Sequence, residues 1–376
     1  MASRPAWAEV DLGAIRHNAS LLAAVVAPSR LCAVVKASGY GHGSVPVARA
    51  ALEGGASWLA VAMVEEGAVL RAHGIEAPVL LLSEPAAAAM DDVVGLRLTP
   101  TVYTHGGVEA AAKAVASAGT AEPLTVHVKV DTGMHRVGVA PGDAVAVVRQ
   151  VAEHPELRLG GVWTHLAVAD EPDNPFTTEQ CRRFDAVVGE LARLGLRPPL
   201  VHAANSAGAL AHPGSRCDLV RCGIALYGVA PSTALAGAGP ATRLRPALSL
   251  RARVSFVKRV EAGEGVSYGL RRPLASASTV ATVPVGYADG VPWRLGVSGG
   301  EVLIGGRRRP LAGSVTMDQI LVDCGDDTAV LPGDEVVLLG RQGTEHISAW
   351  DWASRAGTIA YEILCGIGPR VPKVYG

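Results

Sequence analysis

From residue 31 to about residue 228, the chain alternates short apolar runs with longer amphipathic stretches. The apolar runs are rich in β-branched residues, which is typical of buried strands, and we predict eight strands at residues 31–35, 58–63, 79–82, 96–99, 124–130, 157–164, 200–202 and 217–220. Apolar residues recur at helical spacing at residues 45–52, 64–72 and 181–194. This α/β alternation favours a closed, TIM-like (β/α)8 barrel over an open sheet.

The pattern changes after residue 228. Residues 230–246 are rich in Ala, Gly and Pro, which is typical of a linker. Short β runs separated by glycine-rich turns then follow at residues 248–260, 278–285, 301–304, 320–323 and 335–339, with one helical stretch at 347–356. We therefore expect two domains, a barrel over residues 1–240 and a mainly β C-terminal domain over residues 241–376.

The composition of the 376 residues narrows the class of protein. Apolar residues make up 49% and charged residues 18%, which is typical of a globular chain, and the formal net charge is -1. Because no block of like charges occurs, we expect neither nucleic acid nor a membrane surface as a partner. The six cysteines show no C-x-x-C pair and no zinc spacing, so we expect reduced thiols, no metal and a cytoplasmic location.

Polar side chains follow the predicted strands of the barrel, where active sites of this fold lie. They are Lys36, Tyr40, Lys129, Asp131, Arg136, His165, His202, Asn205, Ser206 and Arg221. Lys36 follows an apolar strand directly and precedes a loop with glycine at positions 39, 41 and 43. A partly desolvated lysine can be neutral and can condense with an aldehyde as a Schiff base, although an isolated lysine at a strand end is more often simply solvated.

The segment from Ala33 to Gly43, AVVKASGYGHG, resembles the signature around the lysine that binds pyridoxal phosphate (PLP) in alanine racemases. Further matches follow in the family's order at residues 131–138, 164–165, 202–206, 221–228, 266–269, 286–290, 317–319 and 361–364. The resemblance covers essentially the whole chain. It implies a PLP-binding barrel followed by a β domain, in a head-to-tail homodimer with shared active sites.

The resemblance assigns two catalytic bases. Lys36 forms the Schiff base with the cofactor and acts on the D-substrate, and Tyr268 of the partner subunit acts on the L-substrate. Physically, racemisation removes a proton from one face of a carbon and returns it on the other, so two groups on opposite sides are expected. A free phenol with a pKa of about 10 is a poor base at neutral pH, and the resemblance implies that His165 lowers this pKa.

By the same resemblance, Arg221 faces the pyridine nitrogen of the cofactor. An arginine cannot give up its proton, so the nitrogen stays unprotonated and the ring is a weaker electron acceptor. The cofactor phosphate is bound by a set of hydroxyl and backbone N–H groups, namely Tyr40, Ser206, Gly223, Ile224 and Tyr361. Hydroxyl groups and exposed backbone donors near a helix start suit such an anion.

The resemblance also implies how the substrate carboxylate is bound. Arg136 contacts the carboxylate, together with the backbone N–H of Met317 from the partner subunit, and a fork of donors suits this group. Lys129 matches a lysine that is carbamylated in some family members, and an unmodified lysine is an equal alternative. Thr316 stands where the family commonly has cysteine, which affects the shape of the substrate entrance.

Three classes of protein fit a PLP barrel. A single-domain PLP carrier would lack the β domain that holds Tyr268, and a basic amino-acid decarboxylase would have a carboxylate in place of Arg221. We therefore expect a racemase that interconverts L- and D-alanine and supplies D-alanine for peptidoglycan. A racemase of another small amino acid, such as serine, is the closest alternative, and a catabolic role remains open.

Overall fold

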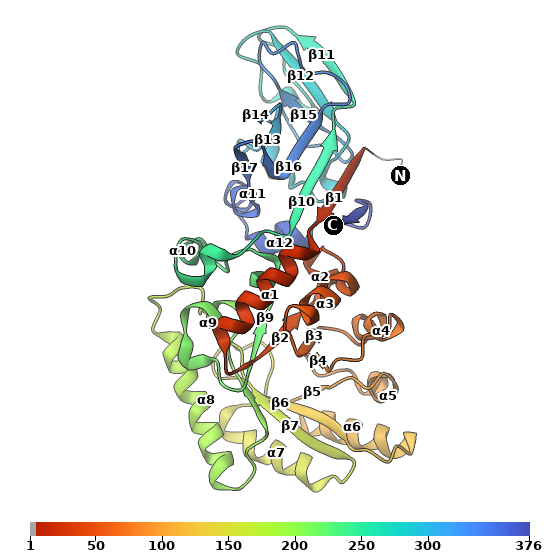
Figure 1. Ribbon diagram of the computed structural model, residues 1–376, viewed down its shortest axis with the longest axis vertical. Coiled ribbons are helices and arrows are strands. Elements are labelled where there is room, and N and C mark those ends of the chain that lie inside the picture. Colours follow the sequence, from red (N-terminus) through yellow and green to blue (C-terminus); the bar gives the residue numbers. More distant parts are fainter. Residues whose placement is uncertain (1–4) are drawn as a thin grey trace. The chain divides into compact units, whose positions relative to one another are not determined.

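The computed structural model describes residues 5–376 (Figure 1) and divides into two compact units. We call Ala14–Gly39 and Ser44–Arg245 the barrel unit. The β unit contains Tyr40–Gly43, Pro246–Gly376 and the described residues up to Gly13. No helix within residues 5–376 is both long enough and apolar enough to cross a membrane.

Eight parallel strands form the barrel within the described residues. They are β2 (Arg30–Val34), β3 (Trp58–Val61), β4 (Val79–Leu81), β5 (Thr101–Val102), β6 (Leu124–Lys129), β7 (Leu157–Trp163), β8 (Leu200–His202) and β9 (Leu219–Cys222). They pair in the orders β4-β3-β2-β9 and β5-β6-β7-β8. A parallel bridge between Leu80 and Thr99 joins β4 to β5, and backbone bonds such as Asp218 N–H to Val201 O (2.9 Å) join β8 to β9. The expected (β/α)8 barrel is confirmed.

Amphipathic helices cover the outside of these strands, as α6, α7 and α8 do around β6 and β7 (Figure 1). The helices are α1 (Leu12–Val26), α3 (Ser44–Glu53), α4 (Val64–Ala72), α5 (Met90–Gly95), α6 (His105–Ala118), α7 (Ala144–Glu153), α8 (Phe176–Arg193) and α9 (Ser206–Ala211). Helix α8 buries Gln180, Phe184, Val187 and Leu191, three or four residues apart, which places them on one face. The periodicity therefore predicted helix α4 at its observed bounds, and most of α3 and α8.

The predicted strand at residues 96–99 was wrong except at Thr99, which forms the parallel bridge to Leu80. Residues 96–98 are instead the turn that ends α5, where Arg97 has a φ of 50° and its N–H donates to Val94 O. Leu98 is buried beside Gly67 of α4. The strand begins at Thr101, after Pro100. Burial outside a sheet thus produced the same local pattern as a strand.

The segment expected to be a linker is structured. It contains α10 (Thr233–Ala236) and a 3-10 turn at Gly239–Arg243. The fully buried Asn18 of α1 holds the end of this segment, because its Nδ2 donates to Leu226 O (3.1 Å) and Arg245 O (2.8 Å) and its Oδ1 accepts from Arg245 N–H (2.9 Å). A high Ala, Gly and Pro content therefore did not mean disorder here.

The β unit has two sheets within the described residues. The larger has the order β14-β13-β16-β10-β1-β18, with β17 paired to β16, and the smaller has the order β11-β12-β15. Their strands are β1 (Ala6–Val10), β10 (Leu248–Arg253), β11 (Phe256–Val260), β12 (Ser278–Val283), β13 (Glu301–Ile304), β14 (Arg307–Pro310), β15 (Ile320–Asp323), β16 (Glu335–Gln342), β17 (Glu345–Ile347) and β18 (Lys373–Tyr375). The expected mainly β character is confirmed.

Two features of the β unit differ from the predicted pattern. First, strand β1 comes from the start of the chain but lies between β10 and β18 of the larger sheet. The expected boundary between the two domains at residue 240 stays a prediction. The single run expected at 248–260 is two strands, because Val254 N–H binds Asp334 O and Ser255 N–H binds Thr282 O, so the chain changes sheets between them.

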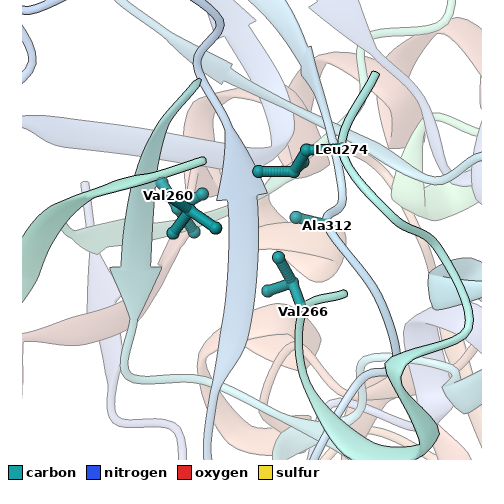
Figure 2. Packing of buried hydrophobic residues seen from close by; sticks show 5 residues of the cluster. Val260, Val266, Leu274 and Ala312 are labelled. Atoms are coloured by element: carbon teal, nitrogen blue, oxygen red, sulfur yellow. The ribbon is translucent and has the colours of Figure 1, made fainter. Parts of the chain in front are cut away.

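A small apolar core supports the three-stranded sheet, and four of its side chains point toward a common centre in Figure 2. Its buried members are Val260, Val266, Leu274, Val280 and Ala312. Two short helices, α11 (Ala349–Ala356) and α12 (Ala360–Cys365), lie between β17 and β18 in the sequence. Val266 leads directly into the segment that carries Tyr268, so this core anchors that segment.

We expect Asn18→Ala to lower the free energy of unfolding by about 2 kcal/mol, because backbone groups at Leu226 and Arg245 lose their partners. Urea unfolding followed by circular dichroism measures this loss. Ser20→Ala, in the same helix as Asn18, is the control. It removes a single hydrogen bond, from Ser20 Oγ to Gly54 O, and should lower the free energy of unfolding by less than about 1 kcal/mol. Equal stability of the Asn18 variant and the unchanged protein would contradict this account.

Candidate active site

The carboxyl ends of the barrel strands bring seven of the predicted residues together. Lys36 follows β2, Lys129 ends β6, Arg136 lies in the loop after β6, His165 follows β7, Ser206 follows β8, and Arg221 and Gly223 lie in and after β9. The positive charges of Lys36, Arg136 and Arg221 all act on Lys129 and on His165. Four basic groups therefore converge on one end of the barrel.

An unusual backbone turn carries Lys36. The three residues after it, Ala37, Ser38 and Gly39, have φ values of 52°, 52° and 61°, and the N–H of Gly39 donates to Val35 O (2.9 Å). Left-handed backbone is costly for the two residues that are not glycine. Glu66 helps to hold the turn, because its Oε1 accepts from Ala37 N–H (2.6 Å). Such strain is typical of functional sites.

Arg221 is buried in the barrel, with 2% of its surface exposed. Its Nη1 donates to His202 Nδ1 (2.7 Å), and its Nη2 donates to Thr164 O (2.7 Å) and Ala203 O (3.0 Å). Burial lowers its pKa to about 10, so the group is still charged at neutral pH. The Nε–H has no hydrogen-bond partner within residues 5–376, so it is available as a donor to a ligand.

Arg221 fixes the protonation of the two histidines that it contacts. A guanidinium can only donate, so Nδ1 of His202 and Nδ1 of His165 (3.4 Å) both accept. Burial and the charge of Arg221 hold the pKa of each imidazole well below its usual value. Each ring is therefore neutral with its proton on Nε2. His165 offers that N–H as a donor, and His202 directs its own toward His127 Nδ1 (3.0 Å).

Lys129 is almost fully buried, and its Nζ lies 4.5 Å from the centre of the Trp163 ring. Burial, followed by the charges of Arg136 and Arg221, lowers its pKa to about 7. About half of these amines are therefore neutral at physiological pH. A neutral amine is a nucleophile, whereas an ammonium is not.

The Asp131 carboxylate organises the loop that carries Arg136. Its Oδ1 accepts from the backbone N–H groups of Gly133 (2.9 Å), Met134 (3.0 Å) and His135 (3.1 Å). Burial would raise the pKa of this carboxyl, but the three backbone donors outweigh burial and hold the pKa below its usual value. The exposed Arg136 therefore extends from a loop that is fixed by an ionised group.

A set of donors suited to a phosphate lies after β8 and β9. The buried Ser206 Oγ accepts from the N–H groups of Gly223 (2.9 Å) and Ala225 (3.3 Å), which places these segments side by side. The N–H of Ile224, between them, has no partner in the described part of the chain. These residues fit an anionic group that four nearby cations would also attract.

The β unit holds the other predicted site residues, Tyr40, Tyr268, Met317 and Tyr361. The rings of Tyr40 and Tyr361 lie 6.4 Å apart, and Gly41 is required beside them because a Cβ there would clash with the Leu364 carbonyl. Tyr268 is 77% exposed, and Met317 is 52% exposed. Side chains this exposed are available to another molecule.

Hydrogen bonds fix the backbone on which Tyr268 is exposed. Ser267 Oγ donates to Ser314 O (2.7 Å), and Ser314 Oγ donates to Tyr268 O (3.0 Å). Thr316 is also engaged, because its Oγ1 donates to Gln319 O (2.8 Å) and accepts from Gln319 N–H (3.1 Å). The residue that departs from the family pattern thus stabilises the loop of Met317.

The sequence did not identify the buried layer beneath the site. His127 is fully buried and contacts His202, whose ring stacks on Trp163 at 5.6 Å. The signal was present, since Thr125, His127 and Lys129 alternate on β6 and so share one face. Gly160 and Gly161 accommodate the imidazole, because a Cβ on either would come within about 3 Å of His127.

Comparison with known proteins agrees with this arrangement. The family described as "Alanine racemase, N-terminal domain" matches residues 10–231, and "Alanine racemase, C-terminal domain" matches residues 247–375. An alanine racemase of Symbiobacterium thermophilum is 48% identical over 373 residues, which cover 99% of this chain and 97% of that protein. The crystal structure of alanine racemase from D-cycloserine-producing Streptomyces lavendulae has a TM-score of 0.94, with 40% identity, covering 100% of this chain and 98% of that one.

A further solved structure, alanine racemase from Streptomyces coelicolor A3(2), has a TM-score of 0.93 and 41% identity, and covers 99% of this chain and 98% of that one. The barrel, the strand-end lysine and the β unit define an enzyme of the amino-acid racemase class. The chain belongs to the alanine racemase family. The expected family and enzyme class are therefore confirmed.

The pKa of Lys129 predicts how stability depends on pH. It falls from 10.5 to about 7 on folding, so the unfolded chain binds more protons between these values. Lys129 therefore destabilises the fold fully below pH 7, and this effect is lost as the pH rises toward 10.5. We expect Lys129→Met to raise the free energy of unfolding by about 3 kcal/mol at pH 6.5, with the gain shrinking toward pH 10.

Urea unfolding at pH 6.5, 8 and 10, without cofactor and in buffer free of carbon dioxide, measures this difference. Met has a volume similar to Lys and leaves no cavity. Lys113→Met, on helix α6, is the control, and it should show no such pH dependence. A gain that is constant across this range, or a loss of stability at pH 6.5, would contradict the assigned pKa.

Proposed function

We propose that this chain is a PLP-dependent enzyme that interconverts L- and D-alanine with two bases, Lys36 and Tyr268 of the partner subunit. The observation that carries the proposal is the strand-end Lys36 beside three other cations, one of which is the charge-fixed Arg221 with an unused Nε–H. Membership of the alanine racemase family supports alanine as the substrate and does not favour serine. We further propose a cytoplasmic location and the supply of D-alanine for peptidoglycan.

The residues at the barrel end fit PLP. When bound, PLP supplies an electron-accepting ring that stabilises the charge left at the substrate α-carbon. Lys36 would hold the group covalently, and the N–H of Ile224 with the Ser206 hydroxyl would bind its phosphate, joined by the hydroxyls of Tyr40 and Tyr361. The N–H of Gly223 donates to Ser206 Oγ (2.9 Å) and would position that hydroxyl toward the phosphate. Because Lys36, Lys129, Arg136 and Arg221 are all basic, a multiply charged anion is needed to balance them.

Arg221 sets the electronic character of the site. Its Nε–H would face the ring nitrogen of the bound cofactor and would keep its proton, since a pKa of about 10 keeps the guanidinium charged at neutral pH. Beside such a donor, the bound ring would supply weaker electron acceptance, which would favour return of the proton to the α-carbon over side reactions.

His165 supports the tyrosine base. Since its Nδ1 accepts from Arg221, its Nε2–H is the donor that remains. A hydrogen bond from this N–H to the Tyr268 phenolate of the partner subunit would stabilise the charged phenolate and so lower the pKa of the phenol. The low pKa of His165 itself keeps the imidazole neutral and prevents it from competing for the proton.

Arg136 binds the substrate carboxylate, and the Met317 N–H of the partner subunit provides a second donor. The Asp131 carboxylate holds the loop that carries Arg136, so the guanidinium is preorganised. Because the carboxylate is held away from both bases, the α-proton of each enantiomer can point to the base on its own face.

A homodimer is supported by the exposed side chains of the β unit. Six large apolar residues between positions 268 and 317 are at least 44% exposed, namely Tyr268, Leu270, Tyr287, Trp293, Val297 and Met317. Aromatic residues and methionine are enriched in protein interfaces, and exposed apolar groups of this kind mark interaction sites. A second copy of the chain would cover them and would receive Tyr268 at its own Lys36.

Tyr268→Phe tests the two-base assignment by separating the half-reactions. In D2O, we expect the variant to exchange the α-proton of D-alanine through Lys36, whereas loss of the α-proton from L-alanine falls by about 10²–10⁴-fold. Proton NMR with chiral chromatography measures both rates. Tyr375→Phe, which removes another exposed phenol of the β unit, is the control and should keep both rates.

The result that would refute Tyr268 as a base is exchange of L-alanine at the unaltered rate. Equal loss of both exchange reactions would indicate instead that Tyr268 positions the substrate for both directions. Lys36→Ala provides the complementary result, since it should abolish the visible absorbance of the bound cofactor and both exchanges.

We also propose that Lys129 is carbamylated. Its pKa of about 7 provides the neutral amine that attacks carbon dioxide, and the carbamate would place one negative charge beside Arg136 and Arg221. This charge would offset part of the repulsion among the four cations and orient Arg136. An unmodified neutral lysine would avoid the cost of burying a charge, but it would leave Arg136 without a negatively charged partner.

Carbon NMR of protein equilibrated with ¹³C-bicarbonate tests this modification. We expect a resonance in the carbamate region that is absent from Lys129→Met and retained in Lys113→Met, and that disappears on acidification. A spectrum that is identical in the unchanged protein and the Lys129→Met variant would show that Lys129 is unmodified.

A further inference from the structure

The barrel has a cavity at the end opposite to Lys36. Its volume is about 640 Å³, and residues at or before the starts of several strands line it, including Arg30 of β2, Trp58 of β3 and Pro78 before β4. None of the residues proposed to bind cofactor or substrate lines this cavity. Cavities of roughly 300–1,000 Å³ are typical of small-molecule sites.

The walls of this cavity are strongly basic. Four arginines line it, Arg30, Arg71, Arg97 and Arg158, against the single acid Glu76. The Arg30 and Arg97 side chains are exposed and have no hydrogen bond or ion pair to any described residue. Unpaired like charges in one concave surface repel each other and concentrate the field on whatever enters it.

The two other arginines are built into the wall. Arg71 donates to four backbone carbonyls, those of Ile75 (2.5 Å), Ala77 (2.9 Å), Leu96 (2.9 Å) and Arg97 (3.0 Å), so it fixes the loops that carry Glu76 and Arg97. Arg158 donates to the Thr125 hydroxyl (2.7 Å), which also lines the cavity. The basic surface is therefore structured and is not a set of independent side chains.

His127 adds a buried donor to the lining. It is fully buried, and its Nδ1 accepts from His202, so its proton lies on Nε2. This Nε2 has no partner within the described residues, and it lies near Gly160, which shares the cavity lining. A buried donor without a partner is uncommon in folded proteins and points to a ligand.

We propose that this cavity is a binding site for a small oxyanion with two or more negative charges, of the phosphate or polycarboxylate class. The excess of arginine over acid provides the charge, Arg30 and Arg97 provide unused guanidinium forks, and His127 provides a neutral donor at the inner wall. Planar guanidinium forks suit phosphate and carboxylate oxygens equally. The size of the cavity suits an ion larger than a single phosphate.

Isothermal titration calorimetry of the PLP-loaded protein at low ionic strength tests the site, with inorganic pyrophosphate and citrate as separate probes. We expect one high-affinity anion per chain, without loss of the absorbance of the bound cofactor, and weaker binding as salt is added. The probe that binds more tightly identifies the phosphate or the polycarboxylate class.

The decisive variant is the double charge reversal Arg30→Glu with Arg97→Glu, which should weaken binding by about tenfold or more. Neither side chain has a partner among the described residues, so the fold should be retained, and thermal unfolding verifies this. The double variant Arg30→Lys with Arg97→Lys should bind, because the charge is kept. Arg149→Glu, an exposed reversal on helix α7 outside the cavity, should bind as the unchanged protein does.

Absence of binding by both probes would overturn the proposal. Equal affinity in the folded charge-reversal variant would do the same, because it would place the anion elsewhere. Neither result bears on racemisation, so the two proposals fail independently.

Discussion

The rest of the site depends on one buried positive charge, that of Arg221. Because this guanidinium donates to both His165 and His202, it makes both imidazoles neutral and fixes which nitrogen carries each proton. His202 transmits the constraint to His127, so one charge determines three tautomers. The same charge helps to lower the pKa of Lys129. A neutral residue at position 221 would leave the protonation of all these groups open.

The cations at the barrel end repel one another and so favour the binding of anions. Lys36, Lys129 and Arg136 share one end of the barrel with Arg221, and Asp131, the nearby carboxylate, is occupied by three backbone donors. Such an arrangement is unfavourable for an isolated chain and favourable for one that binds anions. We therefore interpret the repulsion among these cations as a loss of stability that favours anion binding. A phosphate, a carboxylate and a carbamate would each restore part of the lost stability.

Much of the barrel and its polar strand ends could be predicted from the sequence, because periodicity and burial are local properties. Strand β1 could not, since its partner β10 lies more than two hundred residues along the chain. Residues 96–98 were mistaken for part of a strand because the end of a helix beside a buried residue has a similar apolar pattern. The role of His127 also escaped prediction, because its contact with His202 depends on how β6 and β8 are placed on the two sides of β7.

The central claim is that each active site contains Lys36 of one protomer and Tyr268 of the other. Mixing Lys36→Ala and Tyr268→Phe chains, each inactive in racemisation, tests it directly after unfolding and refolding them together. A shared site predicts that mixed dimers regain one intact pair, giving up to about a quarter of the unaltered activity. A mixture that stays as inactive as its two components, although mixed dimers form, would contradict the account.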